Sequence, residues 1–109
     1  MATNYKVLGQ VAPAANTLTT AYTVPSSTEA VVSSIVVSNQ GPTATTYRIA
    51  IRPDGEAIAQ KHYIAYDVSI PTMDSLAITL GLTLNASDII SVESYSGLAS
   101  FNIFGSEIA

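Results

Sequence analysis

The stretch EAVVSSIVVSN, from Glu29 to Asn39, has the strongest strand character in the chain. Its valines and its isoleucine are β-branched residues, which fit a pleated sheet better than a helix. After Glu29, neither face of the predicted strand carries a charge. A strand without a charged face is usually covered on both sides, or covered on one side while the other meets a partner. We therefore predict that this segment is the central strand of a β-sandwich or jelly roll.

Segments of similar character lie on both sides of this stretch, separated by turn-forming residues. We expect strands over residues 5–11, 18–24, 45–52, 61–68, 75–80, 89–95 and 98–104. Asp54-Gly55 is a hairpin signal that calls for a positive φ at the glycine, and Ser96-Gly97 predicts a closing hairpin between the last two strands. About eight strands with regular turn signals are typical of a sandwich or jelly roll. We expect a single all-β domain of antiparallel strands over residues 1–109.

The two-residue period of the strands predicts which side chains form the core. On a strict period Val31, Ile35 and Val37 share one face of the central strand, and Val32 and Val36 share the other. The expected core consists of Val32 or Val31, Ile35, Val37, Ile49, Ile51, Ile64, Leu76, Ile78, Leu80, Ile90, Val92, Phe101 and Ile103. On segment 61–68 the same period sets Ile64, Tyr66 and Val68 opposite Tyr63, Ala65 and Asp67.

Composition argues against several classes of partner. The net charge is −4 with four lysines and arginines, and a nucleic-acid surface needs clustered basic residues to neutralise phosphates. The chain has no apolar run near the roughly 20 residues that span a bilayer, and no signal peptide is evident at its start. It has no cysteine, which excludes disulfides and thiolate metal sites. We expect neither nucleic acid nor a membrane as partner.

The low fraction of charged residues is the most informative feature of the composition. Only 11% of the residues are charged, against about 25% in an ordinary soluble domain, and the mean hydropathy is positive. One interpretation is a robust β domain with a hydroxyl-rich surface. The interpretation we favour is a subunit whose surface is largely covered by neighbours, because so little charge leaves isolated copies prone to self-association. We expect a homo-oligomer.

No pattern of residues points to catalysis or to a cofactor. His62 is the one histidine, so a zinc site is not expected, and we interpret it as a partly buried or interface residue. The chain has no GxSxG elbow, no calcium-loop pattern and no glycine-rich phosphate loop. A pair of acidic residues serving a glycosidase stays formally open, but nothing favours it. We expect a protein that is not an enzyme, without catalytic, metal or cofactor residues.

The candidate residues for contact with a neighbouring subunit are two arginines, residues near the two chain ends and the tyrosines. Arg48 and Arg52 share one face of a predicted strand, where they either pair with acids across the sheet or form salt bridges to a neighbouring subunit. The segments YKVLGQ and FGSEIA, near the two ends, are apolar-rich, and we expect them to pack on neighbouring subunits. The interface candidates are Tyr5, Leu8, Arg48, Arg52, Ile103, Phe104 and Ile108. The six tyrosines suit cores and interfaces alike, and such rings also serve as stacking platforms in glycan sites.

With these residues in view, the sequence resembles a family of small virion structural proteins from tailed phages, especially aquatic ones. The segments that carry the resemblance are YKVLGQ (5–10), TLTTAYTVP (17–25), EAVVSSIVVSNQG (29–41), TATTYRIAIRP (43–53), KHYIAYD (61–67), LTLNASDIISV (82–92) and FNIFGSEI (101–108). The likeness runs over nearly the whole chain, from Tyr5 to Ile108. It is a pattern of strands and turns and contains no catalytic motif.

The resemblance implies a virion component that is assembled in the host cytoplasm and acts through protein–protein contacts. The role it favours is a capsid decoration, or cement, subunit that stabilises the particle and forms a homo-oligomer such as a trimer. Its partners would be other virion proteins, the major capsid protein or neck and tail proteins. The alternative is a neck, baseplate or tail-fibre component, including an Ig-like or glycan-binding module that contacts the host surface.

Overall fold

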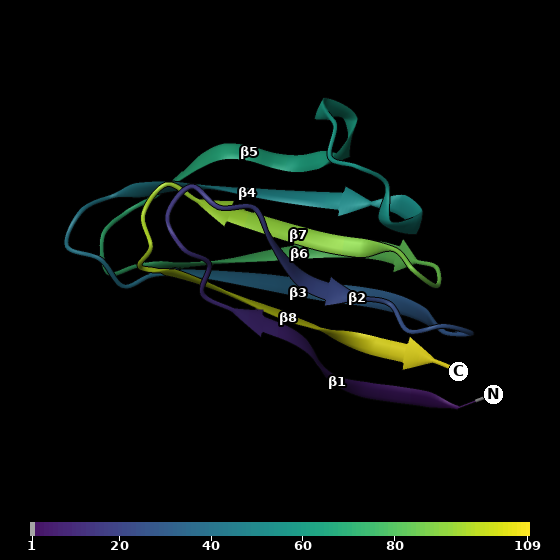
Figure 1. Cartoon of the computed structure of the whole chain (residues 1–109). Coiled ribbons are helices and arrows are strands. Elements are labelled where there is room, and N and C mark those ends of the chain that lie inside the picture. Colours follow the sequence, from purple (N-terminus) through teal and green to yellow (C-terminus); the bar gives the residue numbers. More distant parts are fainter. Residues whose placement is uncertain (1) are drawn as a thin grey trace.

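The computed structural model describes residues 2–109, apart from the side chain of Leu80, and it is built almost entirely of strands (Figure 1). The strands are β1 (Thr3–Val11), β2 (Thr19–Thr23), β3 (Glu29–Asn39), β4 (Thr45–Arg52), β5 (Tyr63–Ile70), β6 (Ser75–Leu84), β7 (Ile89–Ser94) and β8 (Ala99–Ile108). Two short 3₁₀ turns, η1 (Pro53–Gly55) and η2 (Gln60–His62), lie between β4 and β5. The expected all-β sandwich of eight antiparallel strands is confirmed.

The strands form two four-stranded antiparallel sheets with the orders β1-β8-β3-β6 and β2-β7-β4-β5. The chain folds as a set of nested pairs, in which β1 lies beside β8, β2 beside β7, β3 beside β6 and β4 beside β5. In the described residues, only β4 and β5 are both consecutive and paired, so the other connections cross between sheets. Eight antiparallel strands in this order are a jelly roll.

Strand β3 is central in its sheet, as predicted, since it pairs with β8 on one side and β6 on the other. The pairing of β3 with β8 shifts after Val32, where Ser33 is an extra residue that forms a β-bulge. The pairing with β6 shifts at the same point, but there the extra residue lies in β6, between Thr79 and Leu82. The bulge at Ser33 changes which residues face inward: Val32 before it, and Ile35 and Val37 after it, are all fully buried. A strict two-residue period therefore fails at this point, and Val31 lies on the outer side.

The core lies between the two sheets and matches most of the predicted set. Its fully buried aliphatic and aromatic members are Val24, Val32, Ile35, Val37, Ile49, Ile70, Ile90, Val92, Phe101 and Ile103. Ile51, Leu76 and Ile78 pack against this core from partly buried positions, and the Leu80 side chain lies outside the described part of the chain. The prediction for Ile64 is wrong, because Ile64 lies on edge strand β5 and is 45% exposed.

Ile64 is exposed because β5 is irregular. Ala50 of β4 faces Tyr63 and Ile49 faces Ala65, so Ile64 is an extra residue in the edge strand. A bulged residue has no place in the regular alternation of a strand. Bulges also make an edge strand a poor template for pairing with another chain.

Two further sequence expectations need correction or refinement. The closing hairpin is wrong, since β7 pairs with β2 and β4 while β8 pairs with β1 and β3 in the other sheet. Gly55 does have a positive φ, of 70°, but the connection it belongs to spans residues 53–62 and is longer than a two-residue hairpin turn. Local turn signals therefore predicted where the chain bends but not which strands pair.

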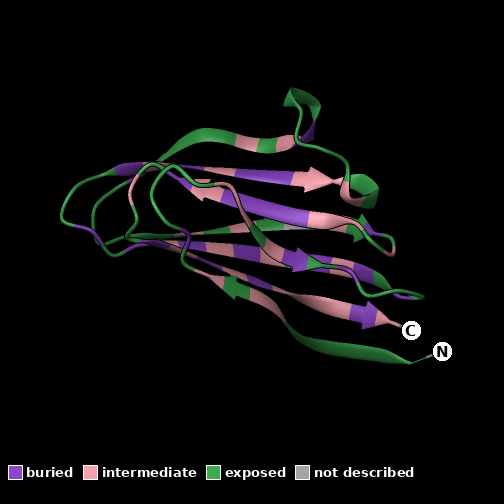
Figure 2. Cartoon of the chain, in the orientation of Figure 1, coloured by how far each residue is buried: buried purple, intermediate pink, exposed green. Residues whose placement is uncertain are grey.

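Both ends of the described chain are strands that belong to the sheet. The backbone groups of Ala2 and Ala109 exchange two hydrogen bonds of 3.0 Å, and the two ends lie together in Figure 1. Figure 2 shows the edge strands β1 and β5 as the most exposed, with burial concentrated on β3, β4 and β7. Within residues 2–109, no helix is long and apolar enough to cross a membrane.

Candidate functional site

The outer face of the β1-β8-β3-β6 sheet carries almost no charge. Paired residues of antiparallel strands share a face, so the register gives its members: Thr3, Tyr5, Val7, Gln10, Glu29, Val31, Ser34, Val36, Ser38, Ser75, Ala77, Thr79, Thr83, Ser100, Asn102, Phe104, Ser106 and Ile108. Glu29, at the start of β3, is the one charged residue in this set. We call this surface the neutral face.

An open hollow on the neutral face is lined largely by apolar side chains. Tyr5 and Val7 of β1, Val31 of β3 and Phe104 of β8 lie around it, and its lining is completed by Lys6, Ser33, Gly105 and Ser106. Tyr5 is 85% exposed and Val7 46% exposed. The neutral face therefore exposes apolar and aromatic side chains and almost no charge, and these two features are typical of surfaces that contact another protein.

The predicted interface residues from the chain ends fall into three groups. Tyr5, Phe104 and Ile108 lie on the neutral face. Leu8 lies at the register shift of β1 and packs from a partly buried position against the core. Ile103 is fully buried inside the core, because on β8 it alternates with Phe104 and points between the sheets, so the prediction of an interface role for Ile103 is wrong.

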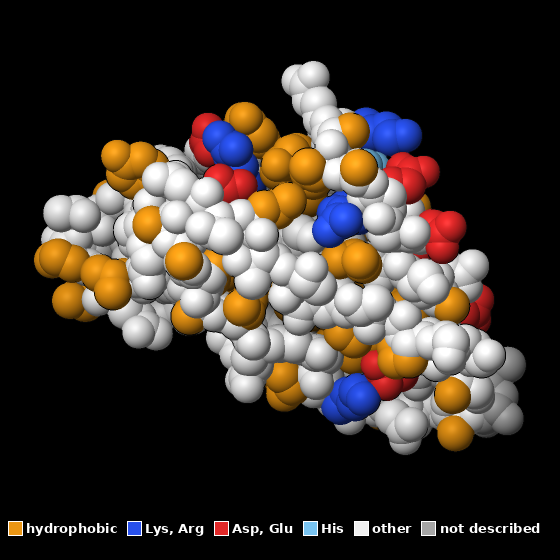
Figure 3. Space-filling view, viewed as in Figure 1, with side chains coloured by type: hydrophobic (Ala, Val, Ile, Leu, Met, Phe, Trp, Pro, Cys, Tyr) orange, Lys and Arg blue, Asp and Glu red, His pale blue; other side chains and the backbone are white. Residues whose placement is uncertain are grey.

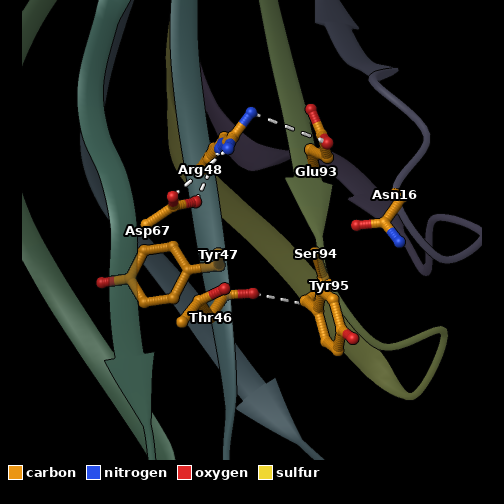
Figure 4. Close-up of a pocket in the computed structure, with 8 residues that line it drawn as sticks. All are labelled: Asn16, Thr46, Tyr47, Arg48, Asp67, Glu93, Ser94 and Tyr95. Atoms are coloured by element: carbon orange, nitrogen blue, oxygen red, sulfur yellow. Dashed lines mark hydrogen bonds and ion pairs between the residues drawn. The ribbon is translucent and has the colours of Figure 1, made fainter.

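The other sheet carries a charged cluster around Arg48 (Figure 4). Arg48 Nε lies 2.7 Å from Asp67 Oδ1, and its Nη2 lies 3.2 Å from Asp67 Oδ2, which makes a two-point ion pair. On the opposite side, Arg48 Nη1 is 3.9 Å from Glu93 Oε2. The hydrogen bond from the guanidinium is the main cause that lowers the pKa of Asp67. The cluster thus joins β5, β4 and β7.

A backbone irregularity brings two consecutive residues to Arg48. The guanidinium carbon lies 4.0 Å from the ring centre of Tyr66, the residue that precedes its ion-pair partner Asp67. Neighbouring residues of a regular strand point to opposite faces, but Asp67 has a φ of 53°, and the β4–β5 register shifts here. The prediction that Tyr66 and Asp67 lie on opposite faces is therefore wrong.

Arg52 holds the loop that connects β4 and β5. Its Nε donates to the carbonyl oxygen of Glu56 at 2.7 Å, and its Nη2 donates to that of Gly55 at 3.3 Å. A third contact joins its Nη1 to Ser91 Oγ at 3.3 Å. Arg48 thus pairs with acids across its own sheet, and Arg52 binds its own loop. A salt bridge from either arginine to a neighbouring subunit stays a prediction.

A groove lies between this loop and strand β5. It is lined by Ile58, Ala59, Gln60, Tyr63 and Tyr66, and we call it the tyrosine groove. The rings of Tyr63 and Tyr66 are 5.0 Å apart at 85° to each other, an edge-to-face contact. Figure 3 shows hydrophobic side chains gathered beside charged ones over this end of the molecule, near β5 and the loops.

A buried ionic contact joins the two sheets at their open edge. The hydroxyl of Tyr22 on β2 donates to Glu107 Oε2 at 2.5 Å, and Lys6 Nζ of β1 lies 2.7 Å from Glu107 Oε1. Glu107 is only 8% exposed. The hydrogen bond from Lys6, followed by that from Tyr22, lowers the pKa of Glu107, while burial and the neighbouring carboxylate raise that of Tyr22.

His62 is buried and has a structural role in the loop. It lies in η2 rather than on a strand, and its Nδ1 accepts the Ala59 backbone N–H at 3.0 Å. Its Nε2 therefore carries the ring proton when neutral and donates to Glu56 Oε1, 3.1 Å away. Within the described residues the ring hydrogen-bonds to no serine hydroxyl, and no group of three or more His, Asp or Glu side chains could hold a metal ion.

Sequence reasoning missed the contacts that depend on the register. Aspartate is among the residues that tolerate left-handed backbone, but the apolar alternation around Asp67 predicted a regular strand, so the bulge there was missed. The partners Lys6 and Glu107 lie near opposite ends of the chain, and neither forms part of a recognisable motif. The available signal was the alternation on β8, which places Glu107 on the same side as Ile103 and hence inward.

Comparison with known proteins does not connect this chain to a family. A scan against protein-family models finds no match, and a search of curated proteins finds no significantly similar sequence.

Proposed function

We propose that this protein is a structural subunit of a tailed-phage particle and that it works through protein–protein contacts rather than catalysis. The observation that carries the proposal is the neutral face, whose outward positions on four strands hold a single charged residue. A surface with so few charges is a poor one to leave in water on a free domain. Contact with neighbouring subunits would cover it.

The fold agrees with this role without assigning it. Jelly rolls of two four-stranded sheets occur in viral capsid proteins, and also in lectin domains and cupins, so the fold by itself leaves function open. The resemblance to small virion proteins over segments 5–10 to 101–108 favours the first of these. Together they support a virion component whose partners are other virion proteins.

The size of the neutral face suits a subunit contact. Four strands spaced about 4.8 Å apart, each about nine residues long at about 3.3 Å per residue, cover about 600 Å² in projection. A standard protein interface buries about 800 Å² on each partner. Protruding side chains such as Tyr5 make the accessible area of the face larger than its projected area. We therefore propose a homo-oligomer, such as a trimer, in which this face meets another virion subunit.

The position that we propose within the particle is a decoration, or cement, subunit on the capsid. Such a subunit stabilises the capsid lattice by bridging neighbouring capsid proteins. The alternative position is the neck, the baseplate or a tail fibre. Either position has the same compartment, the virion after assembly in the host cytoplasm.

Quantitative mass spectrometry of purified particles tests the proposal. Hundreds of copies per particle support the capsid position, and about a dozen or fewer support the neck, baseplate or tail, because these are parts of low copy number by symmetry. Absence of the protein from purified particles, together with its presence free in the lysate, would overturn the proposal.

A further inference from the structure

We infer that the tyrosine groove binds the ring of a neutral sugar, with Tyr66 as the stacking platform and Gln60 as the hydrogen-bonding group. The groove is open to solvent and has a volume of about 650 Å³, within the range of roughly 300–1,000 Å³ that small-molecule sites occupy. Tyr66 is 55% exposed and Ile58 is 40% exposed. This inference is independent of the proposed virion role.

The platform is fixed before any ligand arrives. Arg48 holds Tyr66 at 4.0 Å, and Asp67 and Glu93 in turn hold Arg48. Tyr63 packs edge-to-face against the same ring. A ring that is already held loses little rotational freedom on binding, and this lowers the entropic cost of ligand capture.

The loop that forms the opposite wall is also held in place. Arg52 donates to the carbonyl groups of Gly55 and Glu56, and Asp88 Oδ1 accepts the Asp54 backbone N–H at 2.8 Å. Buried His62 accepts the backbone N–H of Ala59, which itself lines the groove. Both walls of the groove therefore have hydrogen-bonded support.

The charges around the groove indicate a neutral ligand. Arg48 is paired with Asp67, and Glu56 lies 3.7 Å from Lys61 Nζ and 3.1 Å from His62 Nε2. The groove itself is lined by two tyrosines, two aliphatic side chains and one amide. A charged ligand would find no unpaired opposite charge among these lining residues.

A sugar ring has the matching chemistry. One face of a pyranose presents C–H groups with partial positive charge, which are attracted to the negative face of an aromatic ring. Its hydroxyl groups both donate and accept hydrogen bonds, as the Gln60 amide does. An added strand from a peptide is disfavoured, because the extra residue Ile64 and the left-handed Asp67 disrupt the exposed edge of β5.

The test is a titration of the full-length protein with methyl glycosides of glucose, galactose, mannose and N-acetylglucosamine, followed by backbone amide NMR. We expect at least one sugar to shift the amide signals of Gln60, Tyr63 and Tyr66 in a saturable way. Tyr66→Ala should weaken that binding by about tenfold or more, and Gln60→Ala should weaken it in the same direction. The matched control is Tyr95→Ala, since Tyr95 is 69% exposed and lies outside the groove.

Three outcomes would overturn the inference. The first is that no neutral sugar shifts these signals, while a proline-rich peptide or dilution of the protein itself does, which would assign the groove to a peptide or to a second copy. The second is binding that Tyr95→Ala weakens as much as Tyr66→Ala, which would show unspecific stacking on exposed rings. The third is unchanged binding by both Tyr66→Ala and Gln60→Ala in variants whose thermal unfolding shows a normal fold.

Discussion

The hydroxyl of Tyr22 donates a 2.5 Å hydrogen bond to Glu107, a residue 85 positions away in the other sheet. With Lys6 on the far oxygen of the carboxylate, this contact closes the edge where β1 and β2 meet. A buried carboxylate costs free energy unless charged or polar groups satisfy it. Tyr22 and Lys6 therefore supply the partners that the buried carboxylate of Glu107 needs in the folded protein.

Tyr22→Phe should destabilise the fold by about 1.5–3 kcal/mol, because it removes a donor to a charged and buried acceptor. Urea unfolding monitored by circular dichroism measures this change. Tyr47→Phe is the matched control, since Tyr47 is also buried but no hydrogen bond from its hydroxyl is found among the described residues. Equal effects of the two variants would show that the Glu107 contact contributes nothing of its own.

Stability should fall in acid through Glu107. Its pKa in the folded state is lowered, so its contribution is fully present above the unfolded value of about 4.3 and is lost as the pH falls through the folded value. The stability difference between the wild type and Glu107→Gln should therefore be large at neutral pH and shrink in acid. Lys6→Met should move this loss to higher pH, because Lys6 is the largest cause of the lowered pKa. A difference that stays constant with pH contradicts the assignment.

Gly9→Ala should destabilise the fold because β1 passes very close to β2. A Cβ atom at Gly9 would collide with the backbone carbonyl oxygen of Ala21, whereas a Cβ at Gly81 would meet nothing within 4 Å. Overpacking of this kind costs about 1–3 kcal/mol. Thermal unfolding of Gly9→Ala and of the control Gly81→Ala measures the difference, and a Gly9→Ala variant as stable as wild type would show that the edge is loose.

Ile49 and Ile64 lie in the same sheet but differ in burial, so their alanine variants should differ in stability. Ile49→Ala should cost about 2–5 kcal/mol as a cavity substitution, since Ile49 is fully buried. Ile64→Ala removes the same atoms from a side chain that is 45% exposed, and we expect it to cost less than about 1 kcal/mol. Chemical denaturation of both variants checks the prediction, which a similar loss in the two would contradict.

The neutral face should mediate self-association. Thr79→Lys places a charge on that face, and Thr20→Lys places the same charge on an exposed position of the other sheet. We expect the first to weaken self-association by about tenfold or more, since like charges brought together at a symmetric contact repel, and the second to leave it nearly unchanged. Sedimentation velocity over a range of concentrations measures both. A wild-type protein that stays monomeric at micromolar concentration would contradict the role of this face.

Deletion of residues 1–10 would change the folding of the domain as well as any contact with a neighbour. The segment forms most of β1 and pairs with β8, so removing it exposes the edge of β8 and should reduce folding stability as well as association. A point substitution such as Tyr5→Ser, at a side chain that is 85% exposed, is therefore the cleaner probe of contact with a neighbour. It should weaken association without lowering the unfolding temperature.

Local sequence patterns were sufficient to predict the strands, the fold class and most of the core. β-branched residues at alternating positions are a local signal, so Ile35, Val37, Ile49 and Phe101 could be assigned to the core without knowledge of their partners. Turn-forming residues between the segments gave the number of strands in the same way. These features depend on neighbours a few residues away, and for that reason they can be read from the chain.

Tertiary structure alone decided the pairing of the strands and the surfaces that result. The bulges at Ser33 and Asp67 shift the register, which moves Val31 outward and sets Tyr66 and Asp67 together on Arg48. The nested pairing brings Lys6 and Tyr22 to Glu107 and leaves one sheet face almost without charge. Such contacts join residues far apart in the sequence, and their geometry follows from register and packing between sheets, which no local pattern encodes.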